Sequence, residues 1–129
     1  MQDIINISCL VSNQIEKRCP LVNDNMIQEL LYGLNTIYGT VLLQVILYGS
    51  VARNTNTSES DIDIAVILDT NNTKDYEEAL LDFIVDMNLK YDRVFSIIDI
   101  KVSDFIKWEN SLPFFKNVKK DGVVLWKAA

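Results

Sequence analysis

Two apolar runs joined by a short polar segment limit the possible folds more than any other feature of this sequence. The stretch "LYGSVARNTNTSESDIDIAVIL", from Leu47 to Leu68, contains the end of "VLLQVILYG" and all of "DIDIAVIL". Both runs are typical of buried strands. The segment between them is too short for the connection of a dozen or more residues that parallel neighbours require. We therefore predict that these two strands run antiparallel.

The next connection is longer and has a helical pattern. It begins near Thr73 or Asp75 and leads to a third strand, "RVFSIIDIKV". A strand–helix–strand connection of this length is typical of parallel neighbours, so we expect a mixed sheet. The side chains predicted to face inward from this helix are Tyr76, Leu80, Phe83, Ile84 and Met87.

Further helices are predicted before and after these strands in the sequence. Asn23 or Asp24 can cap a helix that ends at Gly39. After the third strand, "SDFIKWEN" begins with a Ser cap, and "FFKNVKKDG" is a second short helix before a terminal "VVLW" strand. The inward positions of the helix that ends at Gly39 are Met26, Ile27, Leu30, Leu31, Leu34, Ile37 and Tyr38.

The expected architecture is an α/β (α+β) domain with helices packed on a small mixed sheet. We expect one domain over residues 1–129, with a core at about 24–102 and C-terminal helices and a short strand at 103–127. A helix within residues 1–20 is predicted from apolar positions that lack a clean period.

Composition excludes several functional classes. The 129 residues are 49% hydrophobic and include no histidine, which excludes His-based triads, His general bases and zinc–His sites. Cys9 and Cys19 could form a disulfide, but their spacing matches neither a zinc site nor a redox motif. No run approaches the roughly 18 apolar residues of a membrane span, and the N-terminus lacks a basic leader. We therefore expect a cytoplasmic protein.

The charge distribution argues against broad nucleic-acid binding. The net charge is −6, whereas proteins that grip phosphate backbones usually present a basic face. A small basic cluster at Lys116, Lys119 and Lys120 is typical of a solvated helix face.

Asp61 and Asp63 are the first candidates for a functional site. Side chains alternate along a strand, so both should project from one face. Two neighbouring carboxylates repel each other unless a positive group lies between them. Mg²⁺ suits this role because it binds one or two carboxylates together with substrate phosphate oxygens. The alternative is that both aspartates lie at an exposed strand end.

Gly49 and Ser50 end the first strand in a corner that could hold phosphate. Glycine allows a close backbone approach, while Ser50 offers a hydroxyl and a main-chain N–H. Arg53, one turn later, could add a charged fork. Together with the aspartates, this corner favours a site for a nucleoside triphosphate.

The combined pattern resembles a known superfamily. Gly49-Ser50, ten residues, then Asp61-Ile62-Asp63 matches the G-S-x10-D-x-D signature of DNA polymerase beta-type nucleotidyltransferases. "LYGSVAR", "SDIDIAV" and the closing "FFKNVKKDGVVLW" are most similar to the minimal nucleotidyltransferase branch. The resemblance implies a polymerase beta-like fold, two Mg²⁺ ions and transfer of a nucleotidyl group, AMP from ATP, to a hydroxyl.

The size of the chain and the resemblance also imply a partner. Relatives of this size often act as antitoxins that add AMP to a tyrosine of an all-helical HEPN-type toxin. Two alternatives remain: a non-catalytic module that binds a nucleotide or toxin, and a small-molecule adenylyltransferase of the aminoglycoside-modifying kind. The second fits less well because such relatives generally carry an extra helical domain.

The resemblance implies a third carboxylate, for which the sequence offers Asp92 and Asp99. Since the second and third strands should be parallel, their starts should share one edge of the sheet. Asp99 would lie roughly 23 Å beyond Asp92 along a strand that rises about 3.3 Å per residue. We therefore predict Asp92 as the third metal ligand and as the base for the acceptor hydroxyl.

Overall fold

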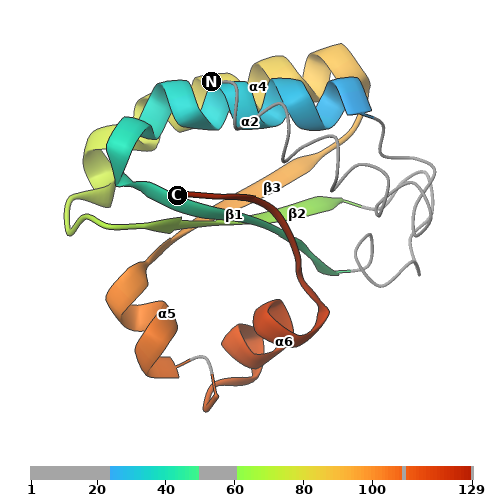
Figure 1. The fold of residues 1–129 in the computed structure, drawn as a ribbon. Helices are drawn as coiled ribbons and strands as arrows, with labels where there is room; N and C mark the ends of the chain where they lie inside the picture. Colours follow the sequence, from blue (N-terminus) through green and yellow to red (C-terminus); the bar gives the residue numbers. More distant parts are fainter. Residues whose placement is uncertain (1–23, 50–60, 109, 129) are drawn as a thin grey trace.

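The computed structural model describes residues 24–49, 61–108 and 110–128. Figure 1 shows three layers, with helices α2 and α4 on one face of a sheet and α5 and α6 on the other. The helices are α2 (Asp24–Tyr38), α4 (Glu77–Tyr91), α5 (Val102–Trp108) and α6 (Pro113–Asp121). The strands are β1 (Leu42–Tyr48), β2 (Ile62–Leu68), β3 (Phe95–Lys101) and β4 (Val123–Lys127).

The sheet is mixed, as predicted from the lengths of the connections. Its strand order is β3-β2-β1-β4. Strand β1 pairs antiparallel with both β2 and β4, whereas β2 and β3 are parallel. Helix α4 supplies the crossover between the parallel strands. As a result, the end of β1 and the starts of β2 and β3 meet at one edge of the sheet.

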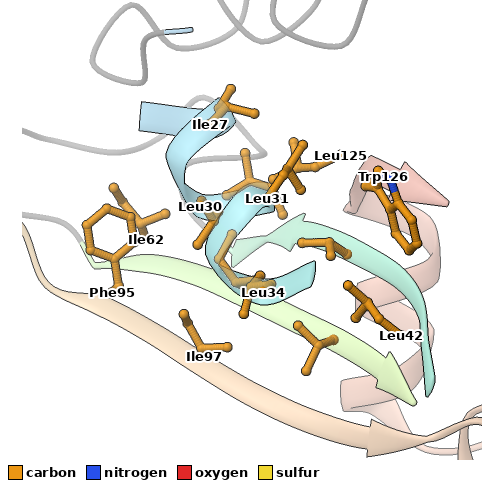
Figure 2. Close-up of a cluster of buried hydrophobic side chains, with 14 of the residues drawn as sticks. Ile27, Leu30, Leu31, Leu34, Leu42, Ile62, Phe95, Ile97, Leu125 and Trp126 are labelled. Atoms are coloured by element: carbon orange, nitrogen blue, oxygen red, sulfur yellow. The ribbon is translucent and has the colours of Figure 1, made fainter. Parts of the chain in front are cut away.

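The larger core lies between the sheet and helices α2 and α4. Figure 2 shows one face of α2 directed onto side chains of β2 and β3, among them Ile62, Phe95 and Ile97. Alternation along β2 makes this the face of the even-numbered residues. The buried side chains that α2 contributes are Met26, Ile27, Leu30, Leu31, Leu34 and Tyr38.

A smaller core lies on the opposite face, under α5 and α6. Ala65 and Ile67 of β2 pack there, where Phe105 of α5 and Val118 of α6 are also buried. The two cores show that both faces of the sheet are covered along most of its length. The odd-numbered residues of β2 therefore face α5 and α6.

The start of one helix and the start of one strand differ from the sequence-based expectation. Helix α5 begins at Val102, so Ser103 lies inside its first turn and is not its cap. Strand β3 begins only at Phe95, because α4 continues to Tyr91 and a short turn follows it. The end of α2 was predicted correctly: Gly39 follows it with φ +59°, a left-handed conformation that suits glycine.

The predicted helix within residues 1–20 lies outside the part of the chain that the structure describes. Among the described helices, none combines the length and the apolar character needed to cross a membrane.

Candidate active site

Asp61 and Asp63 lie at the start of β2, and Asp63 pairs with Tyr48 at the end of β1. Figure 1 shows the end of β1 and the start of β2 at the same edge of the sheet. Asp61 immediately precedes β2 and is exposed, while Asp63 is inside the strand and half-buried. Their spacing places both on the α5 and α6 face, in line with Ala65. Helices α5 and α6 pack on the rows that follow Asp63, among them that of Ala65.

The backbone of Gly49 approaches the carboxylate of Asp63 closely. Gly49 has φ +76°, and a Cβ placed on it would overlap Asp63 Oδ2 and lie 3.1 Å from Asp63 Cγ. Only glycine combines this backbone conformation with this contact at low cost. The predicted phosphate corner and the predicted metal pair are therefore in direct contact. Ser50 and Arg53, which complete the predicted corner, lie outside the described residues.

Tyr48 flanks Asp63 on the other strand. The two residues are partners in the antiparallel pairing of β1 with β2. Burial, and then the nearby charge of Asp63, raise the pKa of the Tyr48 phenol. The phenol is therefore protonated at neutral pH, where its hydroxyl can act as a hydrogen-bond donor.

Ser96 flanks Asp63 on the parallel side, a position that sequence reasoning missed. In the register of β2 with β3, Asp63 pairs with Ser96, one step after Ile62 pairs with Phe95. Ser96 is half-buried and belongs to the same face as Asp63. Parallel pairing was predicted, but the exact register could not be, because it depends on where the turn after α4 ends.

Asp92 lies at the same edge of the sheet but outside β3. It is exposed and caps the end of α4 in a left-handed conformation, with φ 52° and ψ 42°. Among the described residues, no group of three or more Asp, Glu, Cys or His side chains is placed to hold a metal ion. The assignment of Asp92 as the third ligand thus stays a prediction.

Asp99 lies on the other face of the sheet. It pairs with Val66, well along β2, and lines a hollow together with Thr73, Lys74 and Ile97. This placement agrees with the expectation that Asp99 is far from Asp61 and Asp63.

The residues at this edge fit a hard divalent cation bound together with a phosphate group. Asp61 and Asp63 supply two carboxylates on one face, which is the protein contribution that Mg²⁺ commonly accepts. A side chain at position 49 would collide with the Asp63 carboxylate, so glycine brings the backbone close to the two aspartates. In polymerase-type sites, such cations stabilise the attacking and leaving oxygens of an in-line displacement.

Comparison with known proteins identifies the family. Residues 36–129 match the family described as "Polymerase beta, Nucleotidyltransferase". The chain belongs to this family. The nucleotidyltransferase is also 31% identical, over 103 residues, to a homologue from Methanocaldococcus jannaschii named protein adenylyltransferase MJ0604. That similarity covers 80% of this chain and 97% of the relative.

Solved structures confirm the fold of the nucleotidyltransferase. A toxin–antitoxin crystal structure with AMP-PNP matches with a TM-score of 0.55 and 21% identity, covering 79% of this chain and 73% of that one. A mutant of the toxin–antitoxin MntA-HpeT, in which two aspartates one residue apart are changed to glutamate, matches with a TM-score of 0.51 and 20% identity. The match covers 76% of this chain and 71% of the mutant.

Proposed function

We propose that this nucleotidyltransferase transfers AMP from ATP to a hydroxyl of a protein partner, a tyrosine of a HEPN-type toxin, and thereby acts as an antitoxin. The observation that carries the proposal is the contact between Gly49 and the Asp63 carboxylate. It joins the start of the phosphate corner to the two-aspartate pair in one site. The name of the archaeal relative and the AMP-PNP in a structural neighbour support the adenylyl group as the one transferred.

The proposed roles follow from the position of each residue. Asp61 and Asp63 would hold Mg²⁺ against the triphosphate, which positions the α-phosphate for attack. Gly49 gives the phosphates access to the backbone, and Ser50 and Arg53 would donate to their oxygens. Pyrophosphate leaves as the acceptor oxygen bonds to the α-phosphorus, and the acceptor proton passes to a base.

The nature of the acceptor follows from size and charge. A chain of 129 residues with a net charge of −6 is poorly suited to hold a nucleic acid. The toxin–antitoxin neighbours favour a protein acceptor. We therefore place the acceptor hydroxyl on the toxin and expect the chain to bind ATP and the toxin together.

The proposal is tested by co-expressing this chain with the toxin of its own operon and measuring the intact mass of the toxin. With wild-type chain, ATP and Mg²⁺, the toxin mass should rise by one or more AMP units, and peptide mapping should place them on tyrosine. A toxin that is neutralised but unmodified would support a non-catalytic binding module instead. Transfer to an aminoglycoside but not to the toxin would support the small-molecule alternative.

A further inference from the structure

The position beside Asp63 on β3 is occupied by a hydroxyl residue. Paired residues on neighbouring strands lie about 4.8 Å apart, and Ser96 is the β3 partner of Asp63. Alternation places Ser96 on the same face as Asp63, in line with Ile98 and Ile100 of the smaller core. A carboxylate at position 96 would therefore share a cation with Asp63, but the chain has a serine there.

The row that crosses the three strands at this edge thus contains one carboxylate. Tyr48 of β1, Asp63 of β2 and Ser96 of β3 are consecutive partners across the sheet. A hydroxyl can donate a hydrogen bond to a carboxylate, whose remaining lone pairs are then still available to a metal ion. The row therefore flanks the Asp63 carboxylate with two hydroxyl-bearing side chains.

The turn that contains Asp92 is held by contacts on both sides. On the α4 side, the Tyr91 hydroxyl donates to Glu29 Oε1 at 3.1 Å. On the β3 side, the backbone N–H of Phe95 donates to Asn88 Oδ1 at 2.9 Å. The carbonyl of Val94 accepts from the N–H of Ile62 at 2.8 Å. Asp92 itself serves as the left-handed cap of α4.

We propose that Ser96 is the third side chain of the metal site, so that Asp61 and Asp63 are the carboxylates that the described residues supply to it and Asp92 is a structural cap. This inference rests on the proposed function only in that it takes Asp61 and Asp63 to form the metal site. Its consequence is that β3 supplies no carboxylate base for the acceptor hydroxyl. The proton of that hydroxyl must pass to another group, such as solvent or a carboxylate of the partner.

The test is Mn²⁺ binding to the full-length chain, measured by titration calorimetry without nucleotide. Ser96→Asp places a third carboxylate beside Asp63 and should tighten Mn²⁺ binding by about tenfold or more. The matched control is Ser103→Asp, which adds the same charge to exposed Ser103 of α5. Ser103 lies beyond the far end of β3, more than roughly 16 Å from Ser96 at about 3.3 Å per residue.

Asp92→Asn separates the two assignments for the third position. Asparagine tolerates the left-handed conformation, so the turn should be preserved. We expect Mn²⁺ affinity to equal that of wild type, whereas Asp63→Asn should abolish binding. Mn²⁺ binding that weakens in Asp92→Asn as it does in Asp63→Asn would overturn the proposal, as would equal affinities of Ser96→Asp and Ser103→Asp.

A second variant covers the case in which Ser96→Asp fails to fold. Ser96→Cys is nearly isosteric, and its thiolate favours Cd²⁺ over Mn²⁺. Cd²⁺ should bind Ser96→Cys more tightly than Ser103→Cys, which also corrects for Cys9 and Cys19. Equal Cd²⁺ affinities would contradict the proposal. These metal affinities are measured without an acceptor. Toxin modification can therefore fail while the metal assignment holds, and the metal assignment can fail while the toxin is modified.

Discussion

The backbone of Gly49 lies against the carboxylate of Asp63, so closely that a methyl group on Gly49 would overlap Asp63 Oδ2. This contact couples the end of β1 to the start of β2 at the edge of the sheet that carries the candidate site. Gly49 is also left-handed, with φ +76°. An alanine there would face both backbone strain and a displaced carboxylate.

Gly49→Ala should therefore impair both stability and metal–nucleotide binding. The left-handed backbone alone costs an L-residue about 1–2 kcal/mol. Gly39→Ala is the matched control, because Gly39 has φ +59° and nothing lies within 4 Å of the position of its Cβ. Urea unfolding should show a loss in both variants, whereas ATP affinity with Mg²⁺ should fall only in Gly49→Ala. Equal ATP affinities would contradict the role of the contact.

Ser50→Ala tests the phosphate corner. Loss of one donor to a phosphate oxygen should weaken triphosphate binding or turnover by about 1–3 kcal/mol. If Ser50 serves only as a turn or helix cap, thermal stability will fall while ATP affinity and turnover of the folded fraction are unchanged. Isothermal titration with a non-hydrolysable ATP analogue, together with a thermal melt, separates these results.

Asn88 is expected to fix the start of β3. Its Oδ1 accepts the backbone N–H of Phe95, and Phe95 precedes Ser96. Asn88→Ala leaves that N–H without this acceptor and should lower the free energy of unfolding by about 1–3 kcal/mol. Asn88→Asp keeps an acceptor oxygen and should lose less. Equal losses in the two variants, measured by urea unfolding, would show that the side-chain acceptor is unimportant.

Tyr38 offers a pH-dependent test of the larger core. Its hydroxyl is buried without a hydrogen-bond partner among the described residues. Burial, then the charges of Asp99 and Tyr76, raise its pKa well above 10.0. Because the unfolded chain loses this proton first, the contribution of Tyr38 to stability is complete below pH 10 and declines as the pH rises further.

Tyr38→Phe should therefore be nearly neutral or stabilising at pH 7, and its stability should decline less between pH 9 and 11 than that of wild type. Tyr91→Phe is the control, since it removes a hydroxyl that is bonded to Glu29 and should be destabilising at pH 7. Equivalent unfolding curves for the two variants at pH 7 would contradict this interpretation.

Much of the fold follows from the sequence because connection length limits strand direction. The polar segment favoured an antiparallel pair of β1 and β2, and the helix before β3 favoured a parallel pair of β2 and β3, as observed. The placement of Asp61 and Asp63 on one face follows from alternation alone. These features depend on local geometry, which a single sequence contains.

The details around β3 depend on tertiary packing, and sequence alone did not predict them. Val94 has strong β-propensity, yet it lies in the turn after α4, and β3 begins one residue later. Asp92, which ends α4 in a left-handed conformation, precedes this turn. The pairing of Ser96 with Asp63 depends on the resulting register of β2 with β3. The contact of Gly49 with Asp63 depends on the register of β1 with β2. No local pattern specifies either register.

The central claim is that Asp61 and Asp63 form the metal pair of a nucleotidyltransferase. Label transfer from ATP tests it most directly. Wild type, Asp63→Asn and Asp69→Asn are incubated with toxin, Mg²⁺ and α-phosphate-labelled ATP. Asp69 follows β2 at its far end, so its variant changes the same charge away from the site. We predict labelled toxin with wild type and Asp69→Asn, and none with folded Asp63→Asn. Full transfer by Asp63→Asn would contradict the account.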